Sequence, residues 1–386
     1  MMIVILISRI CLITVIVGGG TAGSVIANRL SDDSSKSVLL LEAGKKDRWD
    51  SRESFNINSS SMVKYIRYRS RCGNIKTEPQ KHAFFGYPNH TFGVEMGRVL
   101  GGSSSVNAML YIRGLKDDFD SWAEDGAVGW GYDDILPFFL KTEGKNCHKN
   151  KTKDNTCGLL SFKDVKKTES MKLVYQSAKE VGASDIDSRD PNSLGVFYTR
   201  YTINSGTRQS SSVAYLWPYV DRPNLHIVTD AVVEKVIIRE DLLEAQGVVY
   251  NRGNTKVFAK ARIEVIVSSG PYGSPKLLML SGIGPRNHLK DIGITPLIDS
   301  PVGDNLVQHM LLVMPIVVDM PTISKKNFSN VKTLEDYIFY RKGLFAGDFG
   351  QTDISLIINS PNLVTKKNGP ISTLFWLEGQ IGPVFP

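Results

Sequence analysis

The sequence predicts an α/β fold in which a Rossmann-like domain with a mostly parallel sheet is interleaved with a mixed α+β region that is incomplete. Three observations lead to this prediction. A glycine-rich turn at residues 18–23 lies between an apolar run and a predicted helix, and a second apolar run ends in Glu42. A further strand–glycine–helix pattern occupies residues 263–285. Strands that alternate with helices in this way build parallel sheets.

The glycine turn has the G-x-G-x-x-G spacing at Gly18, Gly20 and Gly23. Residues 13–17 are predicted as the strand before it and residues 23–30 as the helix after it. In such a turn the first glycine allows the tight bend, the second lets backbone N–H groups approach a pyrophosphate, and the third lets helix and strand pack closely. The helix N-terminus adds partial positive charge. The turn therefore predicts an adenine dinucleotide ligand.

The second apolar strand, residues 37–41, ends in an acid that supports the same ligand. Glu42 follows the glycine turn by about twenty residues, the spacing at which a carboxylate accepts hydrogen bonds from ribose hydroxyls. A strand, a glycine turn, a helix, a strand and an acid in this order favour a dinucleotide site over a glycine turn without a ligand. A nicotinamide and a flavin remain equally possible at this point.

Two longer blocks bear on that choice. Residues 97–107 read Gly-Arg-Val-Leu-Gly-Gly-Ser-Ser-Ser-Val-Asn, and Tyr111 and Gly114 follow. Glycines and serines at this density let backbone and hydroxyl donors converge on a flat polar ring. Arg98 adds a fixed positive charge that suits phosphates or an anionic reduced flavin.

The second block, residues 270–285, follows a strand predicted over residues 263–267. We expect a helix to begin at Pro275 with Ser274 as its N-cap, because proline is tolerated at the first helical position. Glycines 282 and 284, followed by a proline, predict the end of this helix. Residues 224–233 are predicted as another strand region.

With both blocks in this order, the chain resembles the glucose–methanol–choline (GMC) family of FAD oxidoreductases, whose two signature patterns they match. The similarity extends from about Val15 to His309 and is closest in style to the insect branch that includes FAD- and quinone-linked glucose dehydrogenases. It implies an FAD-binding region over residues 13–309 and a divergent, partial substrate-domain region over residues 310–386. Within the first region it implies FAD parts near 13–45, 75–160 and 215–309, and a substrate-side part near 160–215.

The resemblance also implies which residues contact FAD. They are Gly18, Gly20, Thr21, Ala22, Gly23, Glu42, Ala43, Arg98, Val99, Gly101, Gly102, Ser103, Asn107, Ala108 and Val233. Val233 matches a position whose backbone meets the adenine. Val106 stands in a loop where some family members carry a histidine that is bonded covalently to the flavin, so FAD is expected to be non-covalent here.

The family transfers a hydride from an alcohol carbon to flavin N5 and uses a histidine base from a C-terminal block. We expect that block to be absent from this chain, so no catalytic residue is named and the chain is expected to be a truncated, inactive form of an alcohol or sugar dehydrogenase. Quinone or oxygen would be the electron acceptor. The alternatives are a non-catalytic FAD-binding or scaffold product of a decayed gene, and a nicotinamide-dependent dehydrogenase of related fold. The two long blocks argue against the last.

Composition agrees with a globular enzyme. The 386 residues are 42% hydrophobic and 22% charged, with a formal net charge of +7. The densest basic stretch, residues 145–167, is interleaved with polar residues and is predicted to be a solvated loop, not a nucleic-acid surface. No transmembrane span and no metal site are predicted.

Secretion is expected from the family, although residues 1–12 are an irregular apolar leader with no room for cleavage before the first strand. Glycosylation sequons at Asn58, Asn89, Asn150 and Asn327 give weak support. Cys147 and Cys157 bracket a polar loop and could close a disulfide in an oxidising compartment.

Overall fold

The computed structural model describes residues 13–46, 72–144, 158–164, 166–190, 194–307, 319, 330–346, 354–358 and 372–376. By its internal contacts the chain divides into two compact units. The first unit comprises residues 1–50, 61–106 and 210–312, and the second comprises residues 51–60, 107–209 and 313–386.

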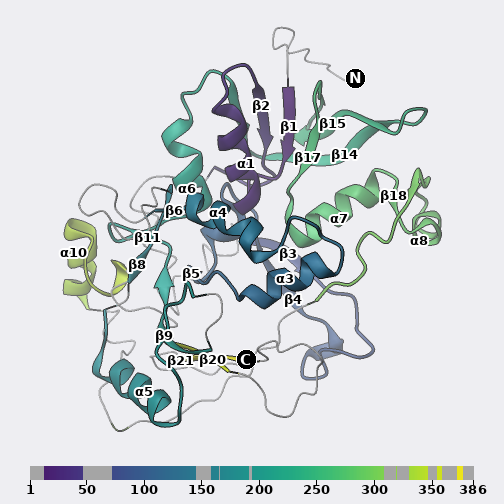
Figure 1. Ribbon diagram of the computed structural model, residues 1–386. Helices are drawn as coiled ribbons and strands as arrows, with labels where there is room; N and C mark the ends of the chain where they lie inside the picture. The colour runs from purple at the N-terminus through teal and green to yellow at the C-terminus, as the bar shows by residue number, and fades with distance from the viewer. Residues whose placement is uncertain are drawn as a thin grey trace. The chain divides into compact units, whose positions relative to one another are not determined.

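The first unit is built on a four-stranded parallel sheet with the order β13-β2-β1-β17. Its strands are β13 (Leu225–Val228), β2 (Ser37–Leu41), β1 (Ile13–Val17) and β17 (Val265–Val267). Figure 1 shows β1, β2 and β17 with helix α1 (Thr21–Ser31) beside them. The parallel sheet confirms the predicted α/β class, and β1 and β2 have the predicted bounds.

The apolar runs of β1 and β2 are continuous because both faces of the sheet are covered. Ile16 and Leu40 face one side and pack with Ala27 of α1. Val15 and Leu39 face the other side and pack with a three-stranded antiparallel sheet. That sheet consists of β14 (Ala231–Arg239), β15 (Glu244–Arg252) and β16 (Thr255–Lys260). Side chains alternate between the faces of a strand, so a strand covered on both faces is apolar throughout.

The prediction for the second strand–helix unit was wrong at the helix start. Helix α7 spans Gly270–Leu280, its N-cap is Ser269, and Pro275 lies inside it. Pro271 occupies the first turn, where a missing N–H costs little, and the Ser274 hydroxyl accepts a hydrogen bond from the Ser269 N–H (3.0 Å). The predicted helix end is confirmed, because the chain leaves α7 through Gly282, whose φ is +88°.

The predicted strand region at residues 224–233 is two strands in different sheets. β13 ends at Val228 and β14 begins at Ala231. Between them Asp230 has a φ of +55°, a left-handed conformation that interrupts an extended strand.

The remaining elements of the first unit are short. They are β3 (Cys72–Lys76), η2 (Pro88–His90), β4 (Gly93–Gly97), η3 (Gly102–Ser105), α6 (Ser211–Tyr215), η4 (Trp217–Tyr219), β18 (Ile283–Gly284), α8 (Arg286–Asp291) and β19 (Ile298–Asp299).

The second unit is mixed α+β, as predicted. One antiparallel sheet has the order β21-β20-β9 and a second has the order β5-β10-β8. Their strands are β21 (Ser372–Trp376), β20 (Ile354–Ile358), β9 (Gly195–Tyr198), β5 (Leu110–Tyr111), β10 (Arg200–Tyr201) and β8 (Lys163–Asp164). The helices are α3 (Lys116–Glu124), α4 (Tyr132–Thr142), α5 (Glu169–Glu180), α10 (Val331–Tyr340) and η5 (Leu344–Ala346). Short pairs complete the unit: β6 (Glu143–Gly144) with β7 (Leu160–Ser161), and β11 (Ile203–Asn204) with β12 (Thr207–Arg208).

The contacts place residues 107–160 with the second unit, whereas the family resemblance counts them among the FAD parts. Contacts group residues and do not assign ligands, so the division into cofactor and substrate parts stays a prediction. Several features named in the sequence lie outside the described residues: Cys147, Cys157, His309 and the sequons at Asn58, Asn150 and Asn327. No helix in the described part of the chain is long and apolar enough to cross a membrane.

Candidate functional site

The glycine turn connects β1 to α1 in the first unit. Gly18 has a φ of +102°, and a Cβ there would lie 2.5 Å from the carbonyl oxygen of Ser268. A Cβ on Gly23 would lie 1.9 Å from the Gly18 carbonyl oxygen. Both distances are far inside van der Waals contact, so the fold itself requires glycine at these two positions.

Gly20 is different. It is the N-cap of α1, with extended backbone (φ −80°, ψ −157°) that any residue adopts. A Cβ there would meet only the Cα of Gly102, at an ordinary 3.7 Å. Packing therefore leaves room for a side chain at Gly20, and a glycine at this position keeps open the space in front of the helix N-terminus. An open space at the N-terminus of an 11-residue helix suits an anion such as a pyrophosphate.

The second glycine loop lies against the first. The Gly101 N–H donates to the Gly19 carbonyl oxygen at 2.7 Å, although the two residues are far apart in sequence. A Cβ on Gly102 would lie 2.6 Å from the Gly20 Cα, so only glycine permits this approach. The loop at residues 97–106 thus lies beside the Gly18 turn. Ser103 is exposed on η3, and its hydroxyl accepts from the Gly97 N–H at 3.2 Å.

Glu42 follows β2 and lies beneath the glycine turn. Its Oε2 accepts from the Gly19 N–H at 2.8 Å and its Oε1 from the Gly44 N–H at 2.7 Å. The side chain is buried, and desolvation raises its pKa above 4.5, outweighing these two hydrogen bonds and the positive charge of Arg98, which lower it. Each carboxylate oxygen accepts one of these bonds, so each keeps a further lone pair for a ribose hydroxyl.

The other predicted residues of the first unit take three kinds of position. Thr21 and Ala22 are exposed in the first turn of α1, and Ala43 is half-buried after Glu42. Arg98 is exposed, while Val99 is buried and forms a parallel bridge with Lys45. Val233 is half-buried on β14. That strand begins where the Ala231 N–H donates to the Glu42 carbonyl oxygen at 2.9 Å.

Asn107 and Ala108 belong to the second unit, and both are exposed. Arg208 holds Asn107 through two hydrogen bonds of 2.8 Å, one to the side-chain Oδ1 and one to the main-chain oxygen. The Met109 N–H also donates to Oδ1, at 3.0 Å. Oδ1 of Asn107 therefore accepts two hydrogen bonds, which uses both of its lone pairs. Sequence reasoning missed Arg208, which lies 101 residues away and carries no local signal.

Sequence reasoning also missed the serines of α6, which reach the glycine loops of the first unit. Ser211 is buried, and its hydroxyl lies 3.3 Å from the carbonyl oxygens of both Gly20 and Gly101. Only the run of serines at residues 210–212 could have drawn attention to this helix.

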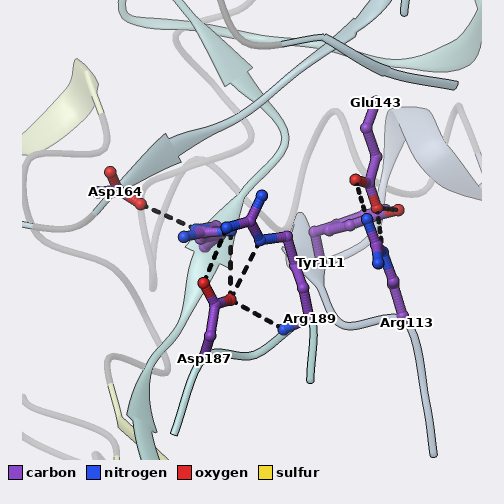
Figure 2. A network of polar contacts seen from close by, with 7 residues as sticks. Tyr111, Arg113, Glu143, Asp164, Asp187 and Arg189 are labelled. Carbon is purple, nitrogen blue, oxygen red and sulfur yellow. Dashed lines mark hydrogen bonds and ion pairs between the residues drawn. The ribbon is translucent and has the colours of Figure 1, made fainter. Parts of the chain in front are cut away.

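A separate polar network stabilises the second unit (Figure 2). Glu143 accepts from the Tyr111 hydroxyl at 2.6 Å, from Arg113 Nε at 2.5 Å and from Arg113 Nη2. The side chains of Arg113 and Glu143 are each only 7% exposed. Burial raises the pKa of Tyr111, and the hydrogen bond and charge of Glu143 raise it further. This cluster is fully paired and indicates a structural role.

Figure 2 also shows the more exposed end of this polar region, around Asp187. Arg189 and Arg200 both approach its carboxylate, and the hydrogen bond from the Arg189 side chain is the main cause that lowers the pKa of Asp187 to about 2. Arg200 also pairs with Asp164 at 3.0 Å.

Neither unit presents a metal-binding cluster: among the described residues, no group of three or more His, Cys, Asp or Glu side chains could hold a metal ion. The absence of a catalytic histidine in this chain stays a prediction.

Comparison with known proteins gives one family. The model for GMC oxidoreductases matches residues 13–311. The glucose dehydrogenase (FAD, quinone) of Drosophila pseudoobscura pseudoobscura is 33% identical over 353 residues, which cover 88% of this chain and 54% of the relative. The oxygen-dependent choline dehydrogenase of Sinorhizobium fredii is 36% identical over 298 residues, which cover 77% of this chain and 52% of the relative. The chain thus spans about half the length of these curated relatives.

Two solved structures have a fold similar to that of this chain. Pyridoxine 4-oxidase from Mesorbium loti superposes with a TM-score of 0.66 at 28% identity, covering 75% of this chain and 55% of that one. A formate oxidase variant from Aspergillus oryzae gives a TM-score of 0.73 at 25% identity, covering 92% and 63%. The resemblance found in the sequence is confirmed.

Proposed function

The chain belongs to the GMC oxidoreductase family, and we propose that it carries the FAD-binding part of an oxidoreductase that acts on the CH–OH group of an alcohol or a sugar. The observation that supports this most is the space at Gly20. Two glycine loops meet there, yet packing does not require glycine at that position. A ligand that occupies the space accounts for the missing side chain.

We assign the parts of FAD as follows. The α1 N-terminus, with Gly20 and Gly102, holds the pyrophosphate, Glu42 accepts from the ribose hydroxyls, and the backbone at Val233 meets the adenine. In the first unit, Arg98 and Ser103 serve the flavin end. In the second unit, Asn107 and Ala108 keep their expected role as FAD contacts, and Arg208 donates to the Asn107 Oδ1 and main-chain oxygen. The FAD is non-covalent, since Val106 has no nucleophile to form a bond.

When bound, FAD supplies the acceptor for a hydride from the alcohol carbon. The residues of this chain bind and orient it, and the fixed charge of Arg98 favours an anionic reduced state. The names of the relatives offer quinone and oxygen as electron acceptors. We also propose secretion. The sequon asparagine Asn89 is exposed on a turn, which is compatible with glycosylation.

Binding of FAD tests the proposal directly. The purified chain is expected to quench the fluorescence of added FAD and to give a flavin visible spectrum, while excess NAD⁺ leaves both unchanged. Anaerobic addition of glucose, choline or a simple alcohol then tests whether the chain alone reduces the flavin, which would bleach its absorbance; an inactive form leaves the absorbance unchanged. Binding of NAD⁺ in place of FAD would contradict the cofactor assignment, and bleaching by one of these donors would contradict the expectation that the chain is inactive and would identify the substrate class.

Acidification is expected to weaken FAD binding, beginning at a pH above 4.5, the ordinary pKa of a glutamate. Because the pKa of Glu42 is raised, its carboxylate takes up a proton at a higher pH than an exposed glutamate does, and a protonated oxygen no longer accepts from a ribose hydroxyl. The variant Glu42→Gln is expected to bind FAD about tenfold to a hundredfold more weakly at neutral pH, since a charged hydrogen bond contributes about 1.5–3 kcal/mol.

The measurement for Glu42 is the FAD dissociation constant as a function of pH. In Glu42→Gln the dissociation constant should no longer rise on acidification, because an amide does not titrate. The exposed Glu264 provides the control, and Glu264→Gln should behave as the native protein does. An unchanged pH profile in Glu42→Gln would show that the ribose carboxylate lies elsewhere.

A further inference from the structure

Two serines connect the glycine loops of the first unit. Ser104 lies on η3 and donates from its hydroxyl to the Gly101 carbonyl oxygen at 2.6 Å. The same hydroxyl oxygen accepts from the Ser211 N–H at 2.9 Å and lies 3.0 Å from the Ser211 hydroxyl. The Ser211 hydroxyl in turn lies 3.3 Å from the carbonyl oxygens of Gly20 and Gly101. We call Ser104 and Ser211 the serine bridge.

The serine bridge contacts a carbonyl group of each loop. Gly20 belongs to the turn after β1 and Gly101 to the loop before η3. Ser211 belongs to α6, a third segment, and its side chain contacts both loops. Ser211 is only 4% exposed. A hydroxyl group buried to that extent is costly unless it is hydrogen-bonded, which makes one geometry of the loops preferred over others.

The direction of these bonds matters for an anionic ligand. A carbonyl oxygen that faced a phosphate oxygen would repel it, because both carry partial or full negative charge. The serine bridge provides donors for the carbonyl oxygens of Gly20 and Gly101. The Gly20 oxygen also accepts from the Ser24 N–H of α1 at 3.0 Å, so both oxygens have donors within the protein. The space at Gly20 is bordered by the α1 N-terminus.

We propose that Ser104 and Ser211 are positioning residues that hold the two glycine loops at the separation the FAD pyrophosphate requires. This inference rests on the proposed function. Neither serine is a catalytic residue, and its hydroxyl acts through the backbone of Gly20 and Gly101.

The test uses three variants of the full chain: Ser104→Ala, Ser211→Ala and the double variant. Each single variant is expected to weaken FAD binding about three- to tenfold, as a hydrogen bond contributes about 0.5–1.5 kcal/mol. The double variant should bind FAD about as weakly as the weaker-binding single variant. The effects of two groups that act as one unit do not add. Ser104→Thr keeps the hydroxyl and should restore the native affinity.

Ser281 gives the matched control. It is fully buried in the same unit, donates to the Leu277 carbonyl oxygen at 2.6 Å and accepts from the Val236 N–H at 2.9 Å, away from the glycine loops. Ser281→Ala should lower the melting temperature without changing FAD affinity, which separates positioning from general stability. Hydrogen exchange without FAD should be faster over residues 97–106 in Ser104→Ala and unchanged there in Ser281→Ala.

The outcomes distinguish the two proposals. If the native chain binds FAD and both serine variants bind it equally well, the serine bridge has no positioning role and the proposed function stands. If the native chain does not bind FAD, the proposed function fails and this inference fails with it. If Ser211→Ala does not fold, Ser104→Ala and Ser104→Thr decide, because Ser104 is only half-buried and its loss disturbs the core less.

Discussion

Replacing Gly20 with valine is expected to weaken FAD binding by about tenfold or more and to leave the fold intact. The backbone at Gly20 suits any residue, and a Cβ there would meet only Gly102 at 3.7 Å. The added methyl groups would instead occupy the space assigned to the pyrophosphate. Overpacking of this kind costs about 1–3 kcal/mol, so affinity should fall by about tenfold to a hundredfold or more.

The measurement combines FAD titration with circular dichroism and a melting curve. Gly20→Ala should give a smaller loss than Gly20→Val, since it adds one carbon atom. Gly23→Ala is the opposite control. Its Cβ would lie 1.9 Å from the Gly18 carbonyl oxygen, so that variant should lose stability whether or not FAD is present. Full FAD affinity in a folded Gly20→Val protein would remove the main support for the proposed function.

Replacing Glu143 with alanine is expected to destabilise the second unit by about 3–5 kcal/mol, because it leaves a buried arginine without its counter-charge. Arg113 and Glu143 are each 7% exposed, and Tyr111 donates to the same carboxylate (Figure 2). Desolvation lowers the pKa of Arg113, while the hydrogen bond and charge of Glu143 outweigh it and raise that pKa. A guanidinium does not lose its proton in proteins, so Arg113 stays charged when Glu143 is removed.

Urea unfolding, with hydrogen exchange to localise the effect, measures this loss. The triple variant Tyr111→Phe/Arg113→Met/Glu143→Leu should recover most of the stability, because no polar group of the cluster is then left unpaired. Asp164 pairs with Arg200 in the same unit, but its side chain is 69% exposed, so Asp164→Ala should cost less than about 1 kcal/mol. A Glu143→Ala protein as stable as Asp164→Ala would show that the buried pair contributes little.

The sequence alone was sufficient for the first β-α-β segment. β1 and β2 have the predicted bounds, and α1 begins two residues before its predicted start. The signals for these elements are local: apolar runs of strand length, a glycine turn between strand and helix, and an acid after the second strand. The two long blocks identified the family because they are also local signals. A contiguous motif can be recognised in the sequence without knowledge of the fold.

Local signals were ambiguous where two positions could each begin the same helix. A serine–proline pair at residues 274–275 has the composition of a helix start, yet α7 begins at Gly270, where Pro271 and the N-cap Ser269 serve equally well. The segment itself contains both possible starts, so its local composition does not decide between them.

Only the tertiary structure decided how the site is assembled. The Gly102 backbone reaches Gly20, Ser211 reaches a carbonyl group 191 residues away, and Arg208 holds Asn107 across 101 residues. Such contacts form between segments that are unrelated in sequence pattern, so neither spacing nor composition predicts them. The sequence by itself located the glycine turn at residues 18–23 and predicted that its backbone accepts a dinucleotide. The fold decided which of its glycines serve packing and which, at Gly20, leaves room for a ligand, because that depends on the neighbours that a Cβ would meet.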